Sequence, residues 1–103
     1  MKERIAIIDG LRSPIAKANG KLNDMSADTL GAIITKELVL RNDIDYKEFD
    51  EVIMGNVAQP SKAMNIARVM AIRAGFPQST PAYTVHRNCA SGMQSISSAI
   101  EKI

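Results

Sequence analysis

The chain has 103 residues, of which 46% are hydrophobic and 23% are charged, as in an ordinary globular domain and unlike a disordered segment. Its formal net charge of +2 comes from scattered residues without a basic run, and it holds two tyrosines and two phenylalanines. We therefore expect no nucleic-acid partner. No stretch approaches the roughly 18 apolar residues of a membrane span, so we expect no membrane association and a cytoplasmic location.

The chain contains one cysteine, Cys89, and one histidine, His86. A single cysteine cannot form an internal disulfide, and the two residues together are too few for the usual ligand set of a structural zinc ion. We therefore expect no bound metal.

The first half of the chain predicts one strand and one helix. Residues Ile5 to Ile8 form a continuous apolar run, typical of a strand that is buried on both faces. The segment from Leu11 to Asp24 has no clear period and predicts a long connection. Ser26 can cap a helix that runs to about Arg41, with Asp28 in its first turn and apolar residues at helical spacing.

The second half repeats this alternation. Residues Glu51 to Met54 predict a second strand, and Asn65 can cap a second helix that ends near Gly75. Residues Tyr83 to His86 predict a third strand, followed by a helix from about Ala90 to Ile103.

The predicted order β-α-β-α-β-α indicates an α/β fold with a parallel sheet. The last helical pattern runs through Glu101 to Ile103 without a glycine, proline or polar stop. A parallel sheet also needs helices on both faces, and the helices expected here cover three strands poorly. We therefore expect residues 1–103 to be part of an incomplete domain.

Cys89 lies where the third expected strand passes into the third expected helix. The first N–H groups of a helix lack internal partners and form the positive end of its dipole, which favours the attacking thiolate form of a cysteine. The same groups, that of Cys89 included, can stabilise an oxyanion. Free cysteines are also among the most buried residues, so position alone leaves a nucleophilic and a buried structural role evenly balanced.

Residues 85–95, Val-His-Arg-Asn-Cys-Ala-Ser-Gly-Met-Gln-Ser, resemble the segment around the acyl-accepting cysteine of the thiolase family. Three further blocks resemble the family in its order and spacing, and together the blocks cover nearly the whole chain: Arg4 to Pro14, Glu51 to Val57, and Asn65 to Arg68 followed by Ala74 to Pro77. Two departures occur. His86 stands where members commonly carry asparagine, and the loop Gln59 to Met64 lacks a common Gly-Gln pair.

The resemblance implies a thiolase-like fold of which residues 1–103 form the N-terminal part. It implies an acyl-CoA C-acyltransferase, of the acetyl-CoA acetyltransferase or 3-ketoacyl-CoA thiolase type, active in fatty acid metabolism. Cys89 would carry the acyl group during formation or cleavage of 3-ketoacyl-CoA, and its backbone N–H would contribute to the oxyanion hole. Coenzyme A would be a substrate carrier, and no cofactor is implied.

The resemblance also implies what this chain lacks. The family's activating histidine, its second cysteine and most coenzyme A contacts come from later segments, so the coenzyme A-binding residues stay unassigned and this portion alone should be inactive. The complete protein should form a homo-oligomer, either a dimer or a tetramer. His86 lies on a strand that alternates its side chains, so we expect it to be structural.

Two alternatives remain open at this point. One is a ketoacyl-synthase-like condensing enzyme, whose cysteine also sits at a helix N-terminus. The other is a non-enzymatic split-gene product or degenerate fragment that needs a complementing chain.

Overall fold

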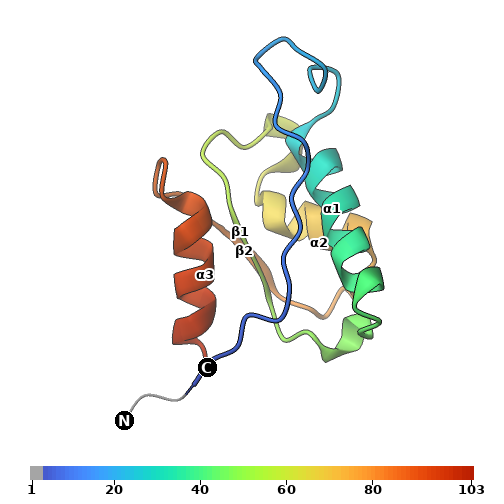
Figure 1. Cartoon of the computed structure of the whole chain (residues 1–103), viewed down its shortest axis with the longest axis vertical. Coiled ribbons are helices and arrows are strands. Elements are labelled where there is room, and N and C mark those ends of the chain that lie inside the picture. The colour runs from blue at the N-terminus through green and yellow to red at the C-terminus, as the bar shows by residue number, and fades with distance from the viewer. Residues whose placement is uncertain (1–3) are drawn as a thin grey trace.

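The computed structural model describes residues 4–103 and contains, within them, three α-helices and a two-stranded parallel sheet (Figure 1). In chain order the elements are α1 (Ala27–Arg41), β1 (Val52–Gly55), α2 (Ile66–Ala74), β2 (Ala82–Val85) and α3 (Ser91–Glu101). Two 3-10 turns, Tyr46–Glu48 and Ser61–Ala63, precede β1 and α2 respectively.

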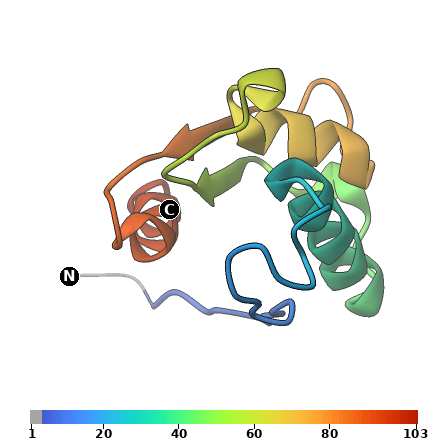
Figure 2. The same cartoon turned by 90° about the horizontal axis from the view of Figure 1, so that it is seen from above.

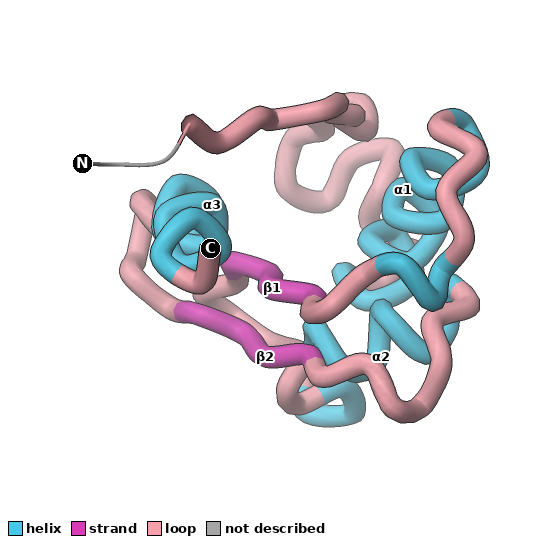
Figure 3. The backbone as a smooth tube through the Cα atoms, turned by 90° about the horizontal axis from the view of Figure 1, so that it is seen from below, coloured by secondary structure: helices cyan, strands magenta, loops and turns pink. Residues whose placement is uncertain are grey.

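The strands lie between helices. Val52 of β1 is opposite Ala82 of β2, and Gly55 is opposite Val85. Helix α2 lies on one side of this pair and α3 on the other (Figure 3), while α1 packs against α2. The α/β class and the parallel pairing of the second and third expected strands are therefore confirmed.

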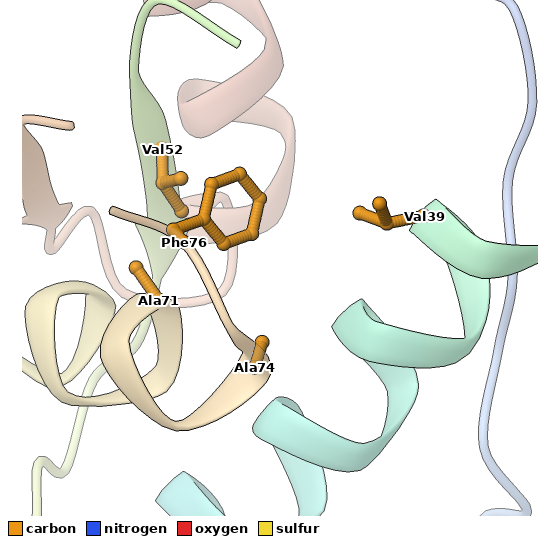
Figure 4. Close-up of a cluster of buried hydrophobic side chains, with 5 residues drawn as sticks. All are labelled: Val39, Val52, Ala71, Ala74 and Phe76. Carbon is orange, nitrogen blue, oxygen red and sulfur yellow. The ribbon is translucent and has the colours of Figure 1, made fainter. Parts of the chain in front are cut away.

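The hydrophobic core lies between α1, α2 and β1. The rings of Tyr46 and Phe49 meet the ring of Phe76 edge to face, with centroids 4.9 and 5.3 Å away. Figure 4 shows the buried side chains of this cluster, which are Val39, Val52, Ala71, Ala74 and Phe76. A second buried cluster under α2 joins Ala63, Ile66 and Met70.

Helix α2 begins and ends where the sequence predicts, but acceptors elsewhere in the chain satisfy its first N–H groups. The N–H of Ile66 donates to the Gln59 side chain (2.8 Å), and the N–H of Ala67 donates to the Thr84 hydroxyl (3.0 Å). Asn65 holds the N-cap position, yet its side chain bonds to β2 residues and not to its own helix. Gly75 ends the helix with φ of 114°, a conformation that favours glycine.

The strand predicted at Ile5 to Ile8 is wrong for this structure. The segment forms neither helix nor strand, and Ile7 and Ile8 are 75% and 78% exposed. Because a strand exists only when a neighbour pairs with it, an apolar run by itself cannot fix one. The segment instead runs past α3 towards α1 (Figure 2), where Asp9 accepts a hydrogen bond from the Asn42 side chain (2.7 Å).

An open groove of 720 Å³ lies between this N-terminal segment, α1, β1 and α3. Its walls include Ile8, Leu38, Ile53, Ile96 and Ile103. The third helix is also shorter than predicted: it ends at Glu101, before Lys102.

Candidate active site

Cys89 lies in the turn that joins β2 to α3, two positions before the first residue of the helix. Its side chain is exposed and forms no disulfide. The alternative of a buried structural cysteine is therefore contradicted. The strand-to-helix position predicted from the sequence is confirmed.

The turn has a compact backbone. Asn88 takes a left-handed conformation with φ of 48°, which asparagine tolerates better than most residues. The N–H of Ala90 donates to the Arg87 carbonyl (3.0 Å), and the N–H of Ser91 donates to the Asn88 carbonyl (3.1 Å). Cys89 is thereby placed at the outer bend of a hydrogen-bonded loop.

The side chain of Ser91 reinforces this loop from inside. Its hydroxyl accepts a hydrogen bond from the Arg87 N–H (2.8 Å) and donates one to the Asn88 carbonyl (2.7 Å). Ser91 is 5% exposed. The start of α3 rests directly on Gly55 of β1, because a Cβ at Gly55 would lie 2.3 Å from the Ser91 carbonyl oxygen.

The hydrogen bonds found among residues 4–103 leave three backbone N–H groups around the cysteine without an acceptor, those of Cys89, Gly92 and Met93. All three residues are exposed. A Cβ added at Gly92 would meet nothing within 4 Å. Free N–H groups at the start of a helix beside a thiol can stabilise negative charge on sulfur or on an attacked carbonyl.

The neighbouring titratable and cationic groups make structural contacts. His86 Nδ1 accepts a hydrogen bond from the Asn88 N–H (3.2 Å), and no hydrogen bond joins His86 to Cys89 in the described part of the chain. The Arg87 guanidinium donates to the Gln94 side chain on α3 (2.6 Å). The structural role expected for His86 fits this geometry.

Further out, Arg68 donates to the carbonyls of Gln78 and Thr80, both at 2.8 Å. Arg73 pairs with Asp28 and so joins α2 to α1. Within residues 4–103 no three His, Cys, Asp or Glu side chains gather in a way that could hold a metal ion. None of the helices in that range is both long and apolar enough to cross a bilayer.

Sequence reasoning found Cys89 but not the pair formed by Gly55 and Ser91. The available signal was the position of a glycine at the end of one strand and a small residue at the start of the helix that crosses it. Which strand that helix would touch depends on the tertiary fold, and the local pattern does not contain this information.

A parallel α/β arrangement with an exposed cysteine beside the first N–H groups of a helix is a setting in which protein cysteines can act as nucleophiles. Residues 5–103 match the family model described as "Thiolase, N-terminal domain", and the chain belongs to this family. The family expectation raised by the sequence blocks is thus confirmed.

The names of curated relatives agree with this family membership. The chain is 37% identical over 100 residues to a probable acetyl-CoA acyltransferase of Staphylococcus epidermidis. This alignment covers 97% of this chain and 25% of the relative. It is 41% identical over 101 residues to a 3-ketoacyl-CoA thiolase of Shewanella pealeana. This alignment covers 98% of this chain and 23% of the relative. The chain therefore spans about a quarter of the length of these curated relatives.

Solved structures give the same picture. An acetyl-CoA acetyltransferase of Bacillus anthracis superposes with a TM-score of 0.83 at 40% identity, over 88% of this chain and 23% of that one. Human mitochondrial 3-ketoacyl-CoA thiolase in complex with CoA superposes with a TM-score of 0.82 at 36% identity, over 87% of this chain and 23% of that one. The thiolase-like fold class is confirmed.

Proposed function

We propose that this chain supplies the nucleophile of a thiolase-type acyltransferase, with Cys89 as the residue that accepts the acyl group. The observation that carries the proposal is the exposed Cys89 thiol beside three unpaired N–H groups at the start of α3. Two relatives support it by name, as a probable acetyl-CoA acyltransferase and a 3-ketoacyl-CoA thiolase, and a third is known in complex with CoA.

The chemistry assigned to this chain is the first half of a two-step transfer. The Cys89 thiolate attacks the 3-keto carbonyl of a 3-ketoacyl-CoA, and the carbonyl π electrons move onto oxygen. The free N–H groups of Cys89, Gly92 and Met93 stabilise that oxyanion. When the carbonyl re-forms, the bond between C2 and C3 breaks and its electron pair leaves as the enolate of acetyl-CoA.

A proton donor must then protonate the enolate, and free CoA must take the acyl group from Cys89. Within residues 4–103 His86 bonds to the Asn88 N–H, and no titratable side chain is hydrogen-bonded to Cys89. Sustained turnover therefore needs groups from outside this range, and we expect none from the chain alone. A role in fatty acid metabolism, a cytoplasmic location and a homo-oligomeric state stay predictions.

Acyl transfer to the folded chain tests the nucleophile directly. The native chain is incubated with acetyl-CoA at about pH 9, where free thiols of ordinary reactivity are largely ionised, and intact mass gives the rate of adduct formation. We expect acetylation of Cys89 to be faster in the folded chain than in the same chain in urea, and absent in Cys89→Ala. An adduct that forms no faster in the folded chain contradicts the proposal.

The family match removes the support for a ketoacyl-synthase-like enzyme. A chain that acts only with a complementing chain remains the second candidate, and the 720 Å³ apolar groove favours it. Release of more than one equivalent of free CoA by the pure chain would contradict this candidate and the expected lack of turnover alike.

A further inference from the structure

We propose that Ser91 is a positioning residue for the Cys89 nucleophile, and that Gly55 of β1 provides the surface on which it rests. The proposal rests on the function proposed above for Cys89. Ser91 would hold the Cys89 thiol at a fixed position relative to the free N–H groups at the start of α3.

Burial singles out Ser91. Within Ser91–Glu101, all of which the structure describes, Ser91 is the residue that α3 buries, and the apolar side chains of the helix stay partly or largely exposed. A buried hydroxyl must find partners, since an unpaired one is costly. Ser91 finds two, and both lie in the Cys89 turn.

The two partners lie on the strand side of the cysteine. Arg87 and Asn88 come before Cys89, while Ser91 begins the helix after it, so the hydroxyl joins the two ends of the turn. Cys89 itself makes no hydrogen bond among those found in residues 4–103. Its place relative to the Gly92 and Met93 N–H groups therefore depends on its neighbours.

Gly55 determines how closely the start of α3 approaches strand β1. The hydrogen atoms of its Cα face the backbone of Ser91 and Gly92, where a Cβ would approach to 2.3 and 2.8 Å of the Ser91 oxygen and the Gly92 nitrogen. Backbone atoms cannot yield as a flexible side chain can. Strand β1 thus sets the position of the first turn of α3 through a contact that requires glycine.

The test uses the whole chain and the rate at which iodoacetamide alkylates Cys89, followed by intact mass at pH 7. The alkylation rate of each variant is measured in the folded chain and in urea. The ratio of the folded rate to the unfolded rate corrects for the intrinsic reactivity of the thiol. In the parent chain we expect the folded rate to be higher. In Ser91→Ala we expect the ratio to fall about tenfold, because the hydroxyl and its two hydrogen bonds to the turn are lost.

Three further variants separate positioning from general loosening. Ser95→Ala is the matched control, because the Ser95 hydroxyl donates to the Gly92 carbonyl (2.7 Å) inside the helix and does not touch the turn; its ratio should stay unchanged. Ser91→Thr keeps the hydroxyl and should restore the ratio. Gly55→Ala leaves the hydroxyl in place but displaces its backbone, so its ratio should fall as in Ser91→Ala.

Circular dichroism verifies that each variant is folded, and Gly55→Ala decides the case if Ser91→Ala does not fold. The proposal is overturned by an unchanged ratio in Ser91→Ala, by an equal fall in Ser95→Ala, or by a parent ratio of one. Failure of the nucleophile proposal has a different signature. There the alkylation ratio still depends on Ser91, while acetyl-CoA acetylates the folded chain no faster than the unfolded one.

Discussion

The two helices that flank the strands are held in opposite ways. Helix α2 buries Ile66, Ala67 and Ala71 to 1% exposure or less, and this face packs against the strands and α1. Helix α3 leaves Met93 67%, Ile96 45% and Ile100 41% exposed, and its first turn lies so close to Gly55 that a Cβ there would clash with it. The candidate nucleophile thus lies in the turn next to the end of α3 that rests on Gly55.

This difference shows that burial and function occupy different parts of the fold. The face with α2 supplies the packing that stabilises the sheet, and the face with α3 supplies free backbone donors and an exposed thiol. Because polar turns lose little stabilisation when left accessible to solvent, the candidate site can stay open without weakening the core.

The largest expected effect comes from paired isoleucine substitutions, one on each face. Ile66→Ala should lower the free energy of unfolding by about 2–5 kcal/mol, because it removes a buried side chain and leaves a cavity. Ile100→Ala removes a side chain that is 41% exposed, so its loss should be less than about 1 kcal/mol. Urea titration followed by circular dichroism measures both. Equal losses would mean that the two faces stabilise the fold equally.

A smaller effect is expected at the strand that carries α3. Gly55→Ala should lower the free energy of unfolding by about 1–3 kcal/mol, because the new methyl group meets the Ser91 and Gly92 backbone. Gly10→Ala is the control, since a Cβ there would meet nothing within 4 Å. The same urea titration applies. If Gly55→Ala were as stable as Gly10→Ala, the start of α3 would not be seated on β1.

The smallest effect concerns the link between α1 and α2. A hydrogen bond from the Ser26 side chain is the main cause that lowers the pKa of Asp28 below its usual value. Burial opposes it, and a hydrogen bond from the Asp28 backbone N–H and the nearby Arg73 guanidinium lower the pKa further. The unfolded chain therefore binds a proton at Asp28 more readily than the folded chain does. The stabilisation from Asp28 is present above an unfolded pKa of about 3.9 and is lost as the pH falls through the lower folded pKa.

Asp28→Asn should remove this part of the pH dependence, so urea titrations between pH 6 and acid conditions should show the two stability curves converging as the pH falls. The exposed pair of Glu37 and Arg41 (3.2 Å) provides the control: Glu37→Gln should change stability by less than about 0.5 kcal/mol. Parallel curves for Asp28→Asn and the parent chain would show that Asp28 does not couple proton binding to folding.

Helix and strand positions were predictable where the signals are local. Helix α1 begins after Ser26 and ends at Arg41 as expected, and Gly75 ends α2 with the positive φ that its residue type favours. The strand-to-helix setting of Cys89 also followed from the local pattern. Its role as nucleophile stays a prediction, because the fold shows where the thiol lies and not what it reacts with.

The parts that could not be predicted depend on partners far away in the sequence. The run from Ile5 to Ile8 has the composition of a strand, but composition does not supply the neighbouring strand that would pair with it. The contact between Gly55 and Ser91 joins residues that lie 36 positions apart by their numbers, 91 minus 55. No periodicity or motif within either segment indicates that they touch.

The start of α2 also determines when this helix can form during folding. Its first N–H groups bond to Gln59 and Thr84, and its N-cap Asn65 bonds to β2. A free peptide of residues 65–75 lacks these acceptors and is too short to nucleate a stable helix in water. We therefore expect helix α2 to be completed in the same step that brings the two strands together, with a rate that depends on closing the chain between them.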